Sequence, residues 1–169
     1  SLGEESGEAG ISGLLFRPGG TKKYLVDASD PNINAFGFYG CTFFDASTIL
    51  LQAYSINREV IGSNFQAGAI IQAQETTFSL CNFIDADERA VTIDDPNFHI
   101  TDSLFVANSI AIQITSPGTY SFDNLRFSAN TFDIENTTGQ TITVQCLNGS
   151  NPQTQTNPSG GTVLIQNVV

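Results

Sequence analysis

The stretch ILLQA at positions 49–53 returns twenty residues later as AIIQA at positions 69–73. Three further segments, VTID, IAIQ and FDIE, follow the same pattern. The central apolar residues of the five segments are Leu51, Ile71, Ile93, Ile112 and Ile134. Their spacing of 20, 22, 19 and 22 residues marks an internal repeat of about 21 residues, which is typical of a solenoid, a propeller or an array.

Other columns of residues keep step with this repeat. One contains only phenylalanine, at Phe43, Phe65, Phe83, Phe105 and Phe127. Another contains Arg58, Phe78, Phe98, Tyr120 and Ile142, and the residues two places later are Val60, Leu80, Ile100, Phe122 and Val144. Counting back one period from this pair of columns places a sixth copy near residue 32.

Each copy also has the periodicity of β-strands. Short β-branched stretches such as TFSL, TYSF and TITV alternate apolar and polar residues, and ADER, DDPN and ENTTGQ between them read as turns. A propeller blade needs about 40 residues, and no leucine-rich consensus is present. The sequence therefore predicts an all-β, single-stranded parallel β-helix of about six coils, with equivalent residues stacked about 4.8 Å apart. We expect a right-handed coil from the general preference of parallel crossovers.

The ends of the repeat define the expected domain organisation. We expect residues 1–30 to form a flexible acidic N-terminus and an N-terminal cap, with a short helix or a strand cap at Ile11 to Phe16. Residues 31–149 are the predicted β-helix. Residues 150–169 are a polar loop and one more strand, which closes the last coil, pairs with a neighbouring chain or leads into a further domain. The first residue, Ser1, fits both a processed chain and a piece of a longer protein.

Stacking of the copies sorts their side chains. The five central apolar residues are expected to form an inward aliphatic ladder, and the five phenylalanines a second ladder. The residues after the centre are expected to point outward: Gln52, Gln72, Asp94, Gln113 and Glu135. The residues before it are expected on the same outward face: Leu50, Ile70, Thr92, Ala111 and Asp133. Because Leu50 and Ile70 are large and apolar, we expect a partner to cover them, and Leu50, Ile70, Thr92 and Ala111 are the candidate interface.

The charge balance restricts the classes of partner. The chain has 17 acidic and 6 basic residues, for a net charge of −11. Such a chain repels a phosphate backbone, so no direct nucleic-acid binding is expected, and an anionic membrane surface is disfavoured for the same reason. No stretch is long and apolar enough to span a bilayer, and the opening residues SLGEESGEAG do not resemble a signal peptide.

The three cysteines and the single histidine do not form a reactive group in this pattern. Cys41 and Cys81 fall in one column two coils apart, at about 9–10 Å, which is beyond disulfide reach, and Cys146 falls in another column. They are predicted to be buried free thiols, as in a protein assembled in a reducing cytoplasm. His99 lies between two apolar residues and is expected to point outward, and no GxSxG motif accompanies it. We expect no cofactor and no metal ion.

Carboxylates on neighbouring coils are the strongest sign of catalysis in the sequence. Asp102 and Asp123 make the best pair, but Asp102 aligns with Asn124, which puts the two acids one column out of step. The arginines Arg58, Arg89 and Arg126 each lie near an acidic residue (Glu59, Glu88 and Asp123), as expected for local surface ion pairs. The chain has no Trp and four Tyr, so it offers few stacking platforms for sugars. We therefore expect no enzymatic activity and no catalytic residue.

Two sequons are present, at Asn136-Thr137-Thr138 and Asn148-Gly149-Ser150. They matter only in a eukaryotic secretory context.

The recurring CTF, CNF and SLF triplets resemble those of right-handed parallel β-helix proteins. The tail TGQTITVQCLNGSNPQTQTNPSGGTVLIQNVV resembles the end of β-helix modules in virion proteins of tailed bacteriophages. The resemblance covers about residues 20–169. It implies a structural virion protein, assembled in the host cytoplasm, that decorates a capsid or forms part of a fibre or tail, commonly as a trimer docked on other virion proteins. The alternatives are a carbohydrate-active β-helix, such as a lyase or depolymerase fragment, and an adhesin that binds surface glycans without chemistry.

Overall fold

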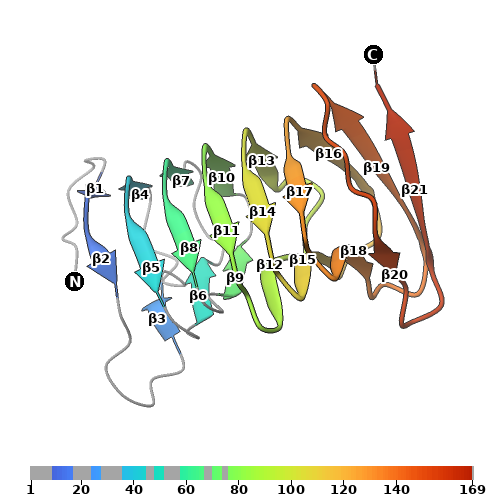
Figure 1. Cartoon of the computed structure of the whole chain (residues 1–169), viewed down its shortest axis with the longest axis horizontal. Helices are drawn as coiled ribbons and strands as arrows, with labels where there is room; N and C mark the ends of the chain where they lie inside the picture. Colours follow the sequence, from blue (N-terminus) through green and yellow to red (C-terminus); the bar gives the residue numbers. More distant parts are fainter. Residues whose placement is uncertain are drawn as a thin grey trace.

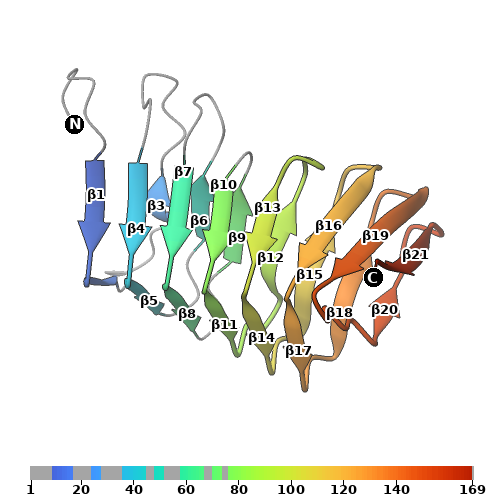
Figure 2. The ribbon, with the colours of Figure 1, turned by 90° about the horizontal axis from the view of Figure 1, so that it is seen from above.

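The computed structural model describes residues 9–16, 24–27, 36–44, 48–51, 58–66, 70–73 and 76–168. Every regular element within these residues is a β-strand, and all the strand pairings are parallel. The strands stack into a rod with the N-terminal coil at one end and the C-terminal coil at the other (Figures 1 and 2). The predicted parallel β-helix is confirmed, with about five turns spaced by about 22 residues where the sequence suggested about six coils.

Three parallel sheets form the walls of the rod. Within the described residues, sheet A runs β1 (Ala9–Ser12), β4 (Phe36–Tyr39), β7 (Arg58–Ile61), β10 (Thr76–Ser79), β13 (His99–Thr101), β16 (Thr119–Asp123), β19 (Thr141–Leu147) and β21 (Thr162–Asn167). Sheet B runs β2 (Leu15–Phe16), β5 (Thr42–Phe44), β8 (Asn64–Gln66), β11 (Asn82–Ile84), β14 (Leu104–Val106) and β17 (Arg126–Ser128). Sheet C runs β3 (Tyr24–Asp27), β6 (Thr48–Leu51), β9 (Ile70–Ala73), β12 (Arg89–Ile93), β15 (Ile110–Ile114), β18 (Phe132–Asn136) and β20 (Gln155–Thr156).

The phenylalanine column predicted from the sequence is confirmed in sheet B. Phe43, Phe65, Phe83, Phe105 and Phe127 are register partners on successive strands. Their rings stack nearly parallel, with centroids 4.6 to 5.2 Å apart, which matches the spacing of the strands that carry them. Phe16 adds one more ring before Phe43, at 4.8 Å, which extends the ladder to β2.

The corner between sheets A and B repeats a left-handed backbone. The residues with positive φ at this corner are Gly13, Gly40, Gly62, Leu80, Asp102, Asn124 and Asn148. Most of them donate their backbone N–H to a carbonyl of the following coil, as Gly40 does to Ile61 at 2.9 Å and Asp102 to Asp123 at 3.0 Å. At this corner, the residue with positive φ turns the chain, and in most coils the same residue also hydrogen-bonds to the following coil.

The aliphatic ladder predicted from the five central residues is wrong in its register. In sheet C, Ile71 pairs with Ile49 and Val91, and the same column continues through Ile112 and Ile134. Leu51 and Ile93 belong to the column two residues further along the strands, in which Ala73 lies between them. The inward direction still holds for Ile93, Ile112 and Ile134, which are at most 1% exposed. The error is a shift of two residues, which keeps a side chain on the same face of a strand.

The column pairing in sheet A differs from the prediction in the same way. Phe78 pairs with Val60 rather than with Arg58, and with Ile100 on the other side. Leu80, predicted to align with Val60, lies at the left-handed corner and is 61% exposed.

The first and the last described strands join the stack of coils. Strands β1, β2 and β3 pair in register with β4, β5 and β6, so the pairing of the rod extends back to Ala9, where the sequence suggested a cap. At the other end, β21 pairs with β19 over six residues. The strand expected in TVLIQNVV therefore closes the last coil of sheet A.

Candidate functional site

The four candidate interface residues do not form one outward column. Leu50 and Thr92 share a column, since both pair with Gln72. Ile70 instead pairs with Thr48, two positions earlier on the strand. Ala111 is fully buried, at 0% exposure, which contradicts the expectation that it points outward. The side chains of Leu50 and Ile70 lie outside the described part of the chain, so their covering by a partner stays a prediction.

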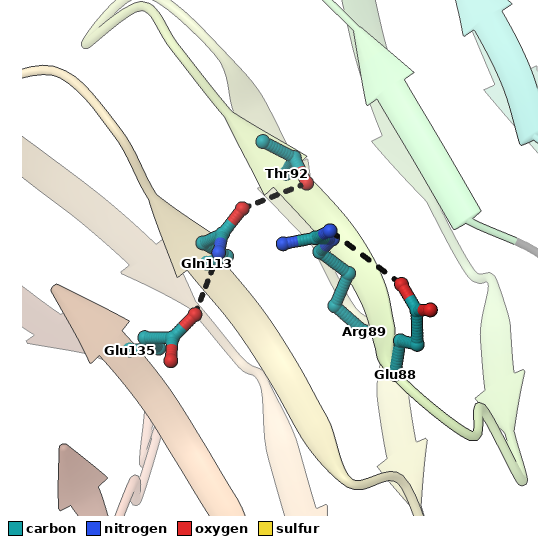
Figure 3. Close-up of polar contacts among 5 residues, drawn as sticks. All are labelled: Glu88, Arg89, Thr92, Gln113 and Glu135. Atoms are coloured by element: carbon teal, nitrogen blue, oxygen red, sulfur yellow. Dashed lines mark hydrogen bonds and ion pairs between the residues drawn. The ribbon is translucent and has the colours of Figure 1, made fainter. Parts of the chain in front are cut away.

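The column that contains Leu50 and Thr92 forms a polar ladder from Thr92 towards the C-terminal end. The hydroxyl of Thr92 donates to Oε1 of Gln113 at 3.4 Å, and Nε2 of Gln113 donates to Oε2 of Glu135 at 2.6 Å (Figure 3). Gln113 and Glu135 were both expected to lie on the outer face, yet Gln113 is only 8% exposed. The polar side chains of this ladder therefore hydrogen-bond to one another.

The carboxylates of Asp102 and Asp123 each accept a hydrogen bond from a different amide side chain. Nδ2 of Asn124 donates to Oδ1 of Asp102 at 2.7 Å, which confirms the predicted alignment of these two residues. Nδ2 of Asn148 donates to Oδ1 of Asp123 at 2.6 Å. Each carboxylate thus has an amide of the following coil as its partner, and both hydrogen bonds lie at the exposed surface.

The predicted ion pairs are only partly present. Arg89 and Glu88 lie 3.5 Å apart, as expected, on a partly exposed surface beside the polar ladder (Figure 3). Arg126 is not paired with Asp123, because its guanidinium donates to the carbonyl of Gly149 at 3.2 Å and to Oδ1 of Asn124 at 3.0 Å. The side chain of Arg58 is outside the described residues. An exposed pair such as Arg89 with Glu88 contributes little to stability.

A buried polar spine, which was not predicted from the sequence, follows the corner between sheets B and C. Oδ1 of Asn108 accepts from the N–H of Ala86 at 3.0 Å, and its Nδ2 donates to the carbonyl of Phe83 at 3.0 Å. One coil further, Nδ2 of Asn130 donates to the carbonyl of Phe105 at 3.1 Å. The signal was present in the sequence as VANS at 106–109 and SANT at 128–131, which are 22 residues apart.

Asp133 ends this spine. It was expected on the outer face but is 4% exposed. Its Oδ1 accepts from Asn130 at 3.0 Å, and its Oδ2 accepts from the backbone N–H groups of Gln153 and Thr154 at 2.7 and 3.1 Å. The carboxylate of Asp133 therefore binds the polar C-terminal loop to the rod, and this role is structural.

The three cysteines are buried free thiols, as predicted. Ser63 lies between Cys41 and Cys81 in their column, since its hydroxyl accepts from the N–H of Cys41 at 3.1 Å and its carbonyl from the N–H of Asn82 at 3.0 Å. Burial raises the pKa of Cys81 to about 11 and also raises the pKa of Cys146. Neither of these two thiols is activated as a nucleophile.

The remaining candidate residues do not assemble into a reactive group. His99 is exposed on sheet A, as expected. Within the described residues, no group of three or more His, Cys, Asp or Glu side chains is placed to hold a metal ion.

Asn136, the first residue of a sequon, is fully buried, and its amide donates to the carbonyls of Gln140 and Thr162. None of the described elements is a helix of membrane-spanning length and hydrophobicity.

Comparisons with protein-family models, with curated proteins and with solved structures find no match to this chain.

Proposed function

We propose that this chain is a non-enzymatic structural protein of a virion, which decorates a capsid or forms part of a fibre or tail. In this proposal it self-associates and docks on a lattice of other virion proteins. The assignment to a virion rests on the resemblance of the repeat and of the C-terminal tail to bacteriophage β-helix modules.

The observation that carries the non-enzymatic part is the pairing of surface carboxylates with amides. Asp102, Asp123 and Glu135 each accept a hydrogen bond of 2.6 to 2.7 Å from an Asn or Gln side chain of a neighbouring coil. A glycoside hydrolase needs two carboxyl groups that face one substrate at about 5 to 9.5 Å, with one of them able to donate a proton. Carboxylates that accept from side-chain amides link successive coils and favour a structural role.

Two measurements on the whole chain test the proposal. Light scattering after size exclusion should give a mass above that of one 18.1 kDa chain, and the fraction of oligomer should rise with concentration. A panel of acidic and neutral polysaccharides should release no reducing ends and no unsaturated sugars. A monomer at every concentration would contradict self-association. Cleavage of a polysaccharide, lost in Asp102→Asn or Asp123→Asn, would favour the carbohydrate-active alternative instead.

A further inference from the structure

The C-terminal end of the rod carries few charged side chains. The last charged residue of the sequence is Glu135, and residues 136–169 contain no Asp, Glu, Lys or Arg. These residues include β19, β20 and β21, which lie together at the C-terminal end in both views (Figures 1 and 2). The whole net charge of −11 is therefore carried by the rest of the chain.

Within the described residues, this end of the rod also presents a strand edge that pairs with no further strand. Among the described residues, β21 is the last strand of sheet A and pairs only with β19. The N–H of Thr162 donates to the carbonyl of Gln140, and the N–H of Val168 to the carbonyl of Cys146. Because backbone groups alternate along a strand, Val163, Ile165 and Asn167 direct their N–H and C=O groups away from β19.

The edge of β21 lacks the sequence features that normally prevent another strand from pairing with it. Edge strands are usually protected by charged side chains, by proline or by a bulge. The segment Thr162–Asn167 has no charge and no proline, and its six pairs with β19 run without a register shift. Its outer face exposes Leu164 at 47%, and Val168 just beyond it is 44% exposed. On the core face, Val163 and the partly buried Ile165 continue the hydrophobic core to the edge.

We propose that β21 pairs antiparallel with β21 of a second copy across a two-fold axis, so that sheet A continues through both copies. The inference rests on the self-association in the proposed function and names the surface that mediates it. Two copies that each carry −11 repel one another, and this C-terminal end is where they meet with the least repulsion. An isologous contact of this kind closes on itself and does not grow into a filament.

The alternation of backbone groups restricts the register of such a pair. Val163 of one copy exchanges hydrogen bonds with Ile165 of the other, since both direct their groups to the free edge. Leu164 then faces Leu164 of the second copy in a non-hydrogen-bonded pair, in which Cα atoms lie about 4.5 Å apart. This register covers the exposed leucine with its own equivalent and places Thr162 opposite Gln166.

The first test compares the solution mass of three proteins by light scattering. Wild type should form a dimer. Leu164→Lys places two like charges opposite each other at the axis and should raise the dissociation constant about tenfold or more. Ser121→Lys makes the same change in net charge on the same exposed face of sheet A, two strands away from the edge, and should dimerise like wild type.

The second test uses cysteine cross-linking to read the register. Leu164→Cys should form a disulfide-linked dimer under mild oxidation, because a separation of about 4.5 Å lies within disulfide range. Gln166→Cys is the matched control: it faces Thr162 of the second copy and should stay a thiol. The native cysteines are buried and should not compete.

The outcomes separate this inference from the proposed function. If wild type associates but Leu164→Lys associates equally well, the edge contact is wrong while self-association stands. If Gln166→Cys cross-links and Leu164→Cys does not, the proposed register is overturned. If wild type is a monomer at all concentrations, self-association itself fails, and with it this contact.

Discussion

The left-handed corner between sheets A and B shows what the fold demands of a single residue. Three of its positions are glycine, which adopts positive φ without strain, and three are Asp or Asn, which tolerate it better than other side chains. Leu80 is the exception, with φ of 55° and a side chain that is 61% exposed. A large side chain in this conformation costs free energy, and at Leu80 little buried area offsets that cost.

Replacing Leu80 with glycine should therefore stabilise the protein. We expect Leu80→Gly to raise the free energy of unfolding by about 0.5–1 kcal/mol, as the relief of left-handed strain exceeds the added entropy of the unfolded chain. Gly62→Ala is the matched reverse change on the preceding coil, at φ of 62°, where the nearest atom to the added Cβ is 4.0 Å away. It should lower the free energy of unfolding by a similar amount. Urea titrations of both variants measure this, and a destabilised Leu80→Gly would show that the leucine makes a contact worth more than its strain.

Residue identity predicted the alignment of the coils where the same type of side chain recurs at equivalent positions. The column of five phenylalanines was found because nothing else occupies the position, and stacking of the rings requires such uniformity. Asn108 and Asn130 occupy a similar column, but only two copies carry the asparagine, and it was not recognised. Burial of an asparagine depends on which backbone groups a corner leaves without partners, and that follows from the path of the chain.

At the scale of strands, the fold was predictable and the register was not. Alternation of apolar and polar residues identified the strands, and it gave the inward direction of Ile93 and Ile112 correctly. It cannot distinguish two registers that differ by two residues, because both place the same faces inward. The spacing between equivalent residues also varies, from 22 between Phe43 and Phe65 to 18 between Phe65 and Phe83. At Leu51, Arg58 and Leu80 the predicted spacing was 20 residues, whereas the observed spacing is 22 in sheet C and 18 in sheet A, so these residues were misaligned by two positions.

The attachment of β21 depends on one close approach of the backbone, at Gly161. A Cβ at this position would collide with the carbonyl oxygen of Gln140 and lie 2.7 Å from Nδ2 of Asn136, which holds the carbonyls of Gln140 and Thr162. We expect Gly161→Ala to cost about 1–3 kcal/mol and to loosen β21 before the rest of the rod. Hydrogen exchange should show protection lost first at the amides of Thr162 and Val168.

The exposed neighbour Ser159 provides the control for this change. Ser159→Ala should leave the free energy of unfolding within about 0.5 kcal/mol of wild type. Equal loss of protection along all of sheet A in Gly161→Ala would mean that β21 does not separate from the rod as a unit.

At the scale of the whole molecule, the separation of charge from the C-terminal end makes a prediction about salt. Association through an uncharged edge is opposed by repulsion between two bodies of net charge −11. Salt screens that repulsion, as the Debye length falls from about 10 Å at 0.1 M to about 3 Å at 1 M. The dissociation constant of the dimer, measured by analytical ultracentrifugation, should therefore fall as salt rises.

A charge variant separates this screening from other effects of concentrated salt. Asp87 is exposed, and Asp87→Lys changes the net charge from −11 to −9, since it removes one negative charge and adds one positive charge. At 0.1 M salt this variant should associate more tightly than wild type, because the repulsion between the copies is smaller. At 1 M salt the two proteins should have the same dissociation constant, since screening has removed the difference. Weaker association of wild type at high salt would instead place ion pairs in the contact and would exclude the uncharged edge as the surface that joins the copies.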